Sequence, residues 1–351
     1  MKAILLAGGK GTRLRPLTLH TPKPIVPIFD RPFLSYQIGL LKQVPEIDEV
    51  ILSLNYQPRR LEETFGDGSG VGMRLRYVVE SSPLGTGGAI RFAAQGVEDT
   101  LVVFNGDVMT SVDVAAVIRR HRERKAKATI VLTPVPNPTA YGLVETDADG
   151  NVRQFLEKPS ADQITCDTIN AGIYVLEPDT FDRIPKDGPY SIERGYFPSL
   201  VANGETFVAY VERGYWIDIG TPEKYRDVHR DIFDGRCPLG PAGIASGAPV
   251  IAPDAKVEEG AVVEGPCFLD AGVTVKAGAR IGPYSVLGRS VLVEEGASVE
   301  GAIVWPNARI ARDAEVGAAL VGRSCHVGKN AVVGAQAILG DKTTLSDYTR
   351  A

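Results

Sequence analysis

The feature that most restricts the fold of this chain is an aliphatic residue that recurs every six positions through its C-terminal third. The series slips by one position twice and comprises Ile251, Val257, Val263, Leu269, Val275, Ile281, Leu287, Val293, Val299, then Ile310 and Val316, then Val327, Val333, Leu339 and Leu345. Ordinary β-rich domains, the alternative, alternate with a period of two and would not hold this register. Hexads instead supply one short strand each, and stacked coils bury an aliphatic column that no single coil buries alone. The pattern predicts a solenoid of roughly five three-sided coils.

The first two thirds of the chain have a different pattern, in which β-rich runs alternate with amphipathic stretches. The expected strands are 2–6, 50–54, 75–79, 101–104 and 129–135, and the expected helices are 33–43, 86–94 and 112–125. Such alternation is typical of a parallel sheet covered by helices, and we predict an α/β fold with a Rossmann-like mixed sheet. Open sheets of this kind bind ligands at the carboxyl ends of their strands. We therefore expect the loops after Leu6 and after Phe104 to share a ligand-binding edge.

A stretch rich in glycine and proline, without periodicity, separates the two patterns. We predict an α/β domain over residues 1–235, a linker over 236–247 and the solenoid over 248–351.

Composition limits the partners of the chain. A net charge of -5 argues against non-specific nucleic-acid or membrane-surface binding, and no segment approaches the roughly 18 apolar residues of a membrane span. The four cysteines form no CxxC pair, so neither a disulfide framework nor a zinc site is indicated. We expect a cytoplasmic protein with free thiols and no nucleic-acid or membrane partner.

The most prominent candidate for phosphate binding is the glycine-rich run that begins at Ala7, directly after the first expected strand. Its glycines let backbone amides approach phosphate oxygens, and Lys10, Arg13 and Arg15 add positive charge. Guanidinium groups match phosphate oxygens with forked hydrogen bonds. The run fits neither the Rossmann nor the Walker pattern, so by itself it is equally compatible with a plain turn.

Further motifs resemble, in the same order, those of the nucleotide-sugar pyrophosphorylases, also called sugar-1-phosphate nucleotidyltransferases. They are Thr21-Pro22-Lys23-Pro24, Pro83-Leu84-Gly85-Thr86-Gly87-Gly88-Ala89, Asn105-Gly106-Asp107, Tyr141-Gly142, Glu157-Lys158-Pro159, Asn170-Ala171-Gly172-Ile173-Tyr174 and Trp216-Ile217-Asp218-Ile219-Gly220-Thr221-Pro222. The resemblance extends along the whole chain, because some members carry a left-handed parallel β-helix of hexapeptide repeats. It implies an enzyme that joins a sugar 1-phosphate to a nucleoside triphosphate, with Mg²⁺ as cofactor, and releases pyrophosphate.

The same resemblance implies a role for each motif. The expected nucleotide-binding residues are Leu6, Ala7, Gly8, Gly9, Gly11, Thr12, Arg13, Glu80, Pro83, Gly85, Thr86, Asn105 and Asp107. The expected sugar-phosphate-binding residues are Lys23, Gly142, Glu157, Lys158, Asn170 and Asp218. Arg13, Lys23 and Lys158 are the expected catalytic residues. Asp107 and Asp218 are the expected metal ligands, since Mg²⁺ usually binds through one or two carboxylates plus substrate phosphates.

The choice of base is expected to depend on Glu80. A carboxylate accepts hydrogen bonds from both N1 and N2 of guanine, whereas an amide suits the mixed edge of a pyrimidine better. The Gly85-Thr86-Gly87-Gly88 form also resembles members that transfer a guanylyl group. We expect GTP and mannose 1-phosphate as substrates; a heptose 1-phosphate, or glucose 1-phosphate with a thymidylyl, uridylyl or adenylyl donor, is left open.

Two other roles are compatible with this architecture. One is a non-enzymatic subunit that senses nucleotide sugars, but such proteins can lose the phosphate and metal ligands that this chain retains. The other makes the solenoid an acyltransferase. His326 is the only histidine in the solenoid and would have to serve that activity. We expect instead that the solenoid is a surface for homo-oligomer assembly or for packing against the catalytic half, and that residues 236–351 are dispensable for the chemistry.

Overall fold

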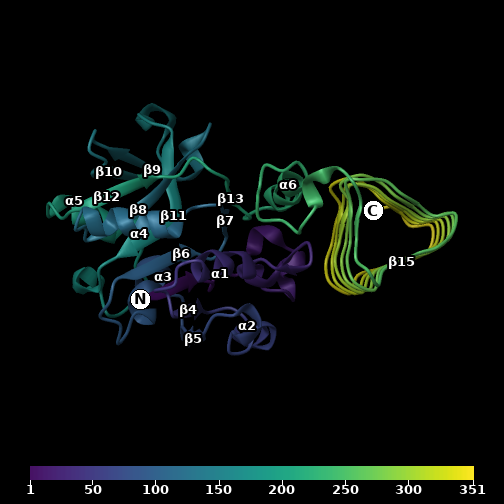
Figure 1. Cartoon of the computed structure of the whole chain (residues 1–351), viewed down its shortest axis with the longest axis horizontal. Helices are drawn as coiled ribbons and strands as arrows, with labels where there is room; N and C mark the ends of the chain where they lie inside the picture. Colours follow the sequence, from purple (N-terminus) through teal and green to yellow (C-terminus); the bar gives the residue numbers. More distant parts are fainter. The chain divides into compact units, whose positions relative to one another are not determined.

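The computed structural model describes all 351 residues and divides them into two compact units (Figure 1). The first unit comprises Met1–Gly9 and Leu34–Asp218, and the second comprises Lys10–Phe33 and Ile219–Ala351. The chain therefore enters the second unit at Lys10, returns at Leu34 and leaves again after Asp218. None of its helices combines the length and the apolar character that crossing a membrane requires.

The first unit is built on a nine-stranded mixed sheet, which confirms the predicted α/β fold class. Its main path runs in the order β10-β9-β11-β6-β1-β4-β5, while β8 joins β11 to β12. The parallel part contains β1 (Lys2–Leu6), β4 (Glu49–Leu54), β5 (Leu75–Val79) and β6 (Leu101–Asn105). The remaining strands are β8 (Ala128–Pro134), β9 (Gly142–Thr146), β10 (Val152–Glu157), β11 (Thr168–Leu176) and β12 (Phe207–Val211).

Five α-helices accompany this sheet in the first unit. They are α1 (Leu34–Lys42), α2 (Pro58–Phe65), α3 (Gly85–Ala93), α4 (Val114–Glu123) and α5 (Phe197–Ala202). The three predicted helices are confirmed as α1, α3 and α4 with ends shifted by one or two residues. Asp113 caps the start of α4: its carboxylate accepts a hydrogen bond from the Ala116 backbone amide, which would otherwise lack a partner.

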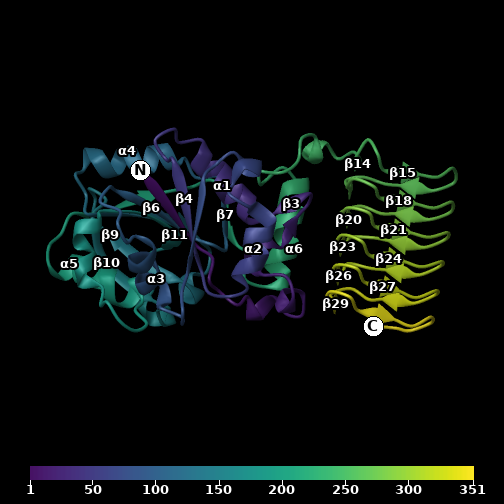
Figure 2. The same ribbon diagram turned by 90° about the horizontal axis from the view of Figure 1, so that it is seen from below.

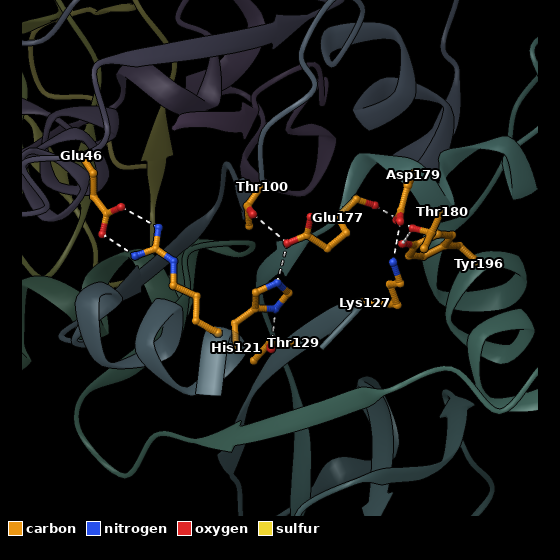
Figure 3. A network of polar contacts seen from close by, with 10 residues as sticks. Glu46, Thr100, His121, Lys127, Thr129, Glu177, Asp179, Thr180 and Tyr196 are labelled. Atoms are coloured by element: carbon orange, nitrogen blue, oxygen red, sulfur yellow. Dashed lines mark hydrogen bonds and ion pairs between the residues drawn. The ribbon is translucent and has the colours of Figure 1, made fainter. Parts of the chain in front are cut away.

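A polar network joins α4 to the sheet (Figure 3). The buried ring of His121 makes 2.9 Å hydrogen bonds to the Thr129 hydroxyl through Nδ1 and to the Glu177 carboxylate through Nε2. The Thr100 hydroxyl donates to the same carboxylate oxygen at 2.6 Å. Burial lowers the pKa of His121, and Glu177 opposes that shift. His121 therefore serves the packing of this layer.

The second unit contains a parallel β-helix, stacked coil on coil (Figure 2), with a three-sided outline (Figure 1). One sheet comprises β14 (Val250–Ile251), β17 (Phe268–Leu269), β20 (Val286–Leu287), β23 (Ile303–Val304), β26 (Leu320–Val321) and β29 (Ile338–Leu339). The next comprises β15 (Lys256–Val257), β18 (Thr274–Val275), β21 (Leu292–Val293), β24 (Arg309–Ile310), β27 (His326–Val327) and β30 (Thr344–Leu345). The third comprises β16 (Val262–Val263), β19 (Arg280–Ile281), β22 (Ser298–Val299), β25 (Glu315–Val316) and β28 (Val332–Val333). This arrangement confirms the predicted left-handed solenoid of hexads.

The two slips in the hexad series have a local cause. The turn between β22 and β23 and the turn between β25 and β26 are each one residue shorter than the turns elsewhere. Gly301 lies in the first of these turns with a φ of 63°, a conformation that glycine adopts without strain. Val304 and Val321, which the series omits, continue the buried column after each short turn.

The second unit also contains α6 (Pro222–Phe233) and the segment Lys10–Phe33, called segment 10–33 below. This segment has three short 3₁₀ turns, at Thr12–Leu14, Leu17–Leu19 and Lys23–Ile25, followed by the paired strands β2 (Pro27–Ile28) and β3 (Arg31–Pro32). It packs on α6 and on the β-helix through aromatic rings, with Phe29 centred 5.0 Å from Phe233 and 5.3 Å from Phe268.

Candidate active site

Three of the predicted motifs of the first unit begin at the same edge of the sheet, where its parallel strands end. Leu6 at the end of β1 is in register with Asn105 of β6 and with Ser53 of β4, while Leu54 is in register with Val79 of β5. The loops that start at Ala7, Gly106 and Glu80 therefore begin side by side. This confirms the expectation that the loops after Leu6 and Phe104 share an edge.

The first loop passes close to its neighbours at Gly8. A Cβ atom added to Gly8 would lie 3.2 Å from the Asn55 nitrogen and 3.5 Å from Glu80 Oε1, whereas nothing lies within 4 Å of one added to Gly9. The Ala7 amide donates to the Ser53 carbonyl oxygen at 2.9 Å and so extends the β1–β4 ladder. Gly8 thus permits a close approach of backbones, and Gly9 leaves open space beside the chain.

The two predicted metal ligands are brought together by a second, two-stranded sheet. Strand β7 (Val108–Thr110) pairs with β13 (Trp216–Asp218), and Asp218 lies opposite Val108, the residue after Asp107. Asp218 is buried, and one of its carboxylate oxygens accepts a 2.9 Å hydrogen bond from the Tyr141 hydroxyl. The register places two carboxyl-bearing residues at one end of this small sheet.

The turn that carries Asp107 is tightly fixed. A Cβ atom at Gly106 would lie 2.4 Å from the Leu6 carbonyl oxygen, so only glycine fits there. The Gln37 side chain, 1% exposed on α1, donates 2.8 Å hydrogen bonds to the carbonyl oxygens of Asn105 and Val108. Gln37 was not among the predicted site residues; the available signal was a single amide in a helix rich in apolar residues.

The donor set at this turn fits a divalent cation that shares its coordination with a substrate. Two carboxylates are hard oxygen donors, and the neighbouring amide oxygen Oδ1 of Asn105 is buried without a hydrogen-bond partner. No part of the chain gathers three or more His, Cys, Asp or Glu side chains suitable for a metal. The residues therefore fit a divalent cation that also takes ligands from a substrate.

The predicted sugar-phosphate motifs converge on the antiparallel end of the sheet. Gly142 of β9 lies opposite Glu157 of β10, and a Cβ at Gly142 would lie 3.1 Å from Glu157 Oε2. The Asn170 side chain accepts a 2.8 Å hydrogen bond from Gly172 and donates one of 2.9 Å to the Tyr174 hydroxyl. The structure thus places Gly142, Glu157 and Asn170 on three paired strands.

Trp216 links this group to the carboxylate pair. Its indole nitrogen donates to the Ala171 carbonyl oxygen at 2.9 Å, and its ring is centred 5.6 Å from the Tyr141 ring. Tyr141 in turn contacts Asp218 and accepts a hydrogen bond from the Lys158 amide through its carbonyl oxygen at 2.9 Å. Trp216 therefore packs the site, and Tyr141 connects its two halves.

Glu157 and Lys158 follow one another at the end of β10. Burial raises the pKa of Glu157, and the Glu193 carboxylate raises it further, whereas the Lys158 ammonium acts in the opposite direction. Lys158 is exposed and has a φ of 54°, which is uncommon for a residue with a side chain. The left-handed turn ends the strand at the exposed cationic side chain.

The second glycine loop is tied to the segment after β11. Gly85 has a φ of 69°, and a Cβ there would lie 2.7 Å from the Tyr190 carbonyl oxygen. The Thr86 hydroxyl donates to Glu193 Oε2 at 2.7 Å and accepts from the Ile192 amide at 3.0 Å. Pro83, just ahead of this contact, is exposed to solvent, while the hydrogen bonds of Thr86 fix the start of α3.

Glu80 is fixed at the start of the same loop. It is 7% exposed, Oε2 accepts a 2.9 Å hydrogen bond from the Leu84 amide and Oε1 accepts one of 3.2 Å from the Ser53 hydroxyl. An ionised carboxylate offers about four acceptor positions. The geometry therefore orients Glu80 and leaves acceptor capacity beyond these two bonds.

The other predicted phosphate ligands belong to the second unit. Gly11 has a φ of 59°, and its carbonyl oxygen accepts a 2.7 Å hydrogen bond from the Thr18 hydroxyl. Thr12 and Arg13 are exposed on the first 3₁₀ turn, whereas Lys23 is 8% exposed. A Cβ atom added to Gly11 would lie 3.1 Å from the Cβ atom of Lys23. The structure thus groups Gly11, Thr12, Arg13 and Lys23 within segment 10–33.

Comparison with known proteins defines the family. Residues 2–235 match the family model described as nucleotidyl transferase, and residues 263–350 match the one described as GMPPB C-terminal domain. The chain belongs to the nucleotidyl transferase family, and it is an enzyme of that class. Members of this family generally use a divalent metal.

Individual relatives extend over both halves of the chain. Mannose-1-phosphate guanylyltransferase of Mycobacterium tuberculosis is 39% identical over 88% of this chain and 80% of its own length. UTP–glucose-1-phosphate uridylyltransferase of Synechocystis sp. is 32% identical over 93% of this chain and 88% of its own length. The crystal structure of HddC from Yersinia pseudotuberculosis complexed with GMP-PN is 29% identical, with a TM-score of 0.56, and covers 66% of this chain and 99% of that structure.

Proposed function

We propose that the chain is a mannose-1-phosphate guanylyltransferase, which makes GDP-mannose and pyrophosphate from mannose 1-phosphate and GTP. The observation that carries the choice of base is the oriented Glu80 carboxylate, because its remaining acceptor positions suit the N1 and N2 donors of guanine. The 39% identity to a mannose-1-phosphate guanylyltransferase over most of both chains supports the same substrate pair.

In the proposed reaction an oxygen of the sugar 1-phosphate attacks the α-phosphorus of the nucleoside triphosphate. One phosphorus–oxygen bond forms there, and the bond from the α-phosphorus to the bridging oxygen breaks, so that pyrophosphate leaves. The nucleophile is already ionised at neutral pH, so no general base is required. The residues instead position two anions and neutralise the charge of the leaving group.

Each predicted residue has a part in this scheme. Arg13 neutralises the leaving pyrophosphate, Lys23 bridges the phosphates and Lys158 holds the sugar phosphate. The sugar hydroxyls bind Glu157 and Asn170, and the Gly142 backbone closes the pocket. The raised pKa of Glu157 suits a carboxyl group that binds hydroxyls away from bulk water. The remaining predicted nucleotide contacts are Leu6, Ala7, Gly8, Gly9, Gly11, Thr12, Pro83, Gly85, Thr86, Asn105 and Asp107.

Asp107 and Asp218 would hold Mg²⁺. When bound there, the cation neutralises phosphate charge. The pairing of β7 with β13 supports this assignment, because it brings the two residues to one end of a sheet. The Tyr141 hydroxyl orients the Asp218 carboxylate through its hydrogen bond.

For the organisation of the chain we propose a catalytic domain over 1–235, a linker over 236–247 and the β-helix over 248–351. The matched ranges of the two family models support a division of this kind. A homo-oligomer is supported by three aliphatic side chains exposed on the first coil, those of Ile251, Val257 and Val262. Four free cysteines, three of them buried, suit a cytoplasmic enzyme.

A second substrate pair, glucose 1-phosphate with UTP, is supported by the similarity to the uridylyltransferase of Synechocystis sp.. Pyrophosphate release, measured with magnesium for each of GTP, UTP, dTTP and ATP against mannose, glucose and heptose 1-phosphates, separates the candidates. The proposal predicts the highest kcat/KM for GTP with mannose 1-phosphate. A higher value for UTP with glucose 1-phosphate would replace it with the second pair.

A further inference from the structure

Hydrogen bonds attach segment 10–33 to the β-helix at two places, and the first is on the last coil. The Thr21 hydroxyl donates a 2.8 Å hydrogen bond to Oδ2 of Asp341, and Oδ1 of the same carboxylate accepts a 2.8 Å bond from the Arg323 amide. Thr21 is 4% exposed. Next to it, a Cβ atom at Gly340 would lie 3.0 Å from the Cβ of Pro16, so Pro16 rests on the coil. Asp341 therefore joins the segment directly to the solenoid backbone.

The second attachment lies on the other side of Lys23. The Tyr225 hydroxyl of α6 donates to the Pro27 carbonyl oxygen, and the indole nitrogen of Trp305, in the β-helix, donates to that hydroxyl at 2.9 Å. Tyr225 and Trp305 are both fully buried. Because every donor in this chain of contacts is paired away from water, the arrangement is costly to disturb.

Lys23 lies between these attachments. It is two residues from Thr21 and four from Pro27, and Pro22 and Pro24 restrict the backbone on either side of it. Its side chain is almost completely buried, which limits the positions that its ammonium group can reach. The placement of Lys23 thus depends on contacts that the β-helix provides.

We propose that the β-helix positions Lys23 for nucleotidyl transfer through the hydrogen bond between Thr21 and Asp341. This inference rests on the proposed role of Lys23 in bridging the phosphates. Thr21 and Asp341 are positioning residues, because they act through Lys23 and do not touch the substrates. The contacts argue against the expectation that residues 236–351 are dispensable for the chemistry.

The test compares full-length variants with matched controls. Thr21→Val keeps the shape of the side chain and removes its hydroxyl, while Thr21→Ser keeps the hydroxyl. Asp341→Ala removes the acceptor, and its control is Asp347→Ala, because Asp347 accepts the corresponding 2.8 Å bond from the Lys329 amide six positions further along. Pyrophosphate release gives kcat and KM for each variant, and thermal unfolding gives Tm.

We expect Thr21→Val and Asp341→Ala to lower kcat about tenfold with little change in either KM, since a small misplacement of a charged group costs turnover. Thr21→Ser and Asp347→Ala should stay within about twofold of the original kcat. The Thr21→Val/Asp341→Ala double variant should lose no more than the larger single loss, because both substitutions remove one interaction. Either single variant suffices if the other does not fold.

Two results would overturn the inference. One is unchanged kcat in both Thr21→Val and Asp341→Ala. The other is an equal loss of kcat in Asp347→Ala, which would make the effect one of general solenoid stability. If the unmodified chain transfers no nucleotidyl group with any triphosphate and sugar 1-phosphate, the proposed function fails, and that result is distinct from a fully active chain whose variants also remain active.

Discussion

Acidification from pH 7.5 to 5.0 should destabilise the second unit through one buried histidine. His229 lies on α6, is 2% exposed, and donates through Nδ1 to the Tyr225 carbonyl oxygen at 2.8 Å. The rings of Phe29 and Tyr225 are centred 5.1 and 4.8 Å from its imidazole. Burial in these aromatic surroundings disfavours the charged ring and lowers the pKa of His229 to about 4.

The sign and size of the effect follow from this pKa. The unfolded chain has a histidine pKa of about 6.5, so the unfolded state binds the proton first as the pH falls. The contribution of neutral His229 to the free energy of unfolding is therefore fully present above about pH 6.5, and it is lost as the pH falls towards 4. Between pH 7.5 and 5.0 the free energy of unfolding should drop by about 2 kcal/mol on account of His229 alone.

Urea unfolding at the two pH values measures this change. The chain has two tryptophans, so a Trp216→Phe background leaves Trp305, in the second unit, as the fluorescent reporter. His229→Asn keeps a donor near the Tyr225 oxygen and does not titrate, and its packing cost is the same at both pH values. The chain with His229 should lose about 2 kcal/mol more than His229→Asn. The control variant His20→Asn, at an exposed site, should lose as much unfolding free energy between the two pH values as the unmodified chain. If the chain with His229 and the His229→Asn variant lost the same unfolding free energy, the reasoning would be refuted.

Three further predictions concern the first unit. Asp107→Asn and Asp218→Asn should each lower kcat at least 10²-fold, the order expected from loss of a charge-stabilising group, without changing Tm; near-normal turnover in both would remove the metal assignment. Glu80→Gln should reduce the ratio of kcat/KM for GTP to that for UTP, and an unchanged ratio would show that Glu80 does not select the base. Gly106→Ala should lower stability by about 2 kcal/mol or more, because its Cβ would lie 2.4 Å from the Leu6 carbonyl oxygen, whereas Gly9→Ala, with nothing within 4 Å, should leave Tm nearly unchanged.

The solenoid could be predicted in detail because each coil depends mainly on its neighbours. An aliphatic residue every six positions is enough to identify the column from Leu269 to Val327, and both phase slips were visible in the series. The residues that fill the column after each slip, Val304 and Val321, were not identified, because the series resumes only one strand later. The parallel strands were also readable, since each is a short apolar run between turns.

The antiparallel end of the sheet was harder to predict. Strand β10 mixes exposed polar residues with Val152 and Phe155, and it acquires its role only by pairing with β9. Helix α2 buries only Leu61 and Phe65, which is too short an apolar stripe to identify a helix. Tertiary contacts decide both elements.

The site residues came from motifs, but their grouping did not. The pairing of β7 with β13 brings Asp218 beside the turn that carries Asp107, although the two residues are far apart in the sequence. No rule of residue spacing predicts that pairing. The same holds for Thr21 and Asp341, which are 320 positions apart. Gln37 was missed because a lone amide in a helix is usually a surface residue.

The most direct test of the account uses GTP labelled at its α-phosphorus, together with mannose 1-phosphate and magnesium. The account predicts that the label appears in GDP-mannose while unlabelled pyrophosphate is released in equal amount. Two results would contradict this: the label stays in GTP, or UTP and ATP labelled at the same phosphorus transfer their label to product equally well.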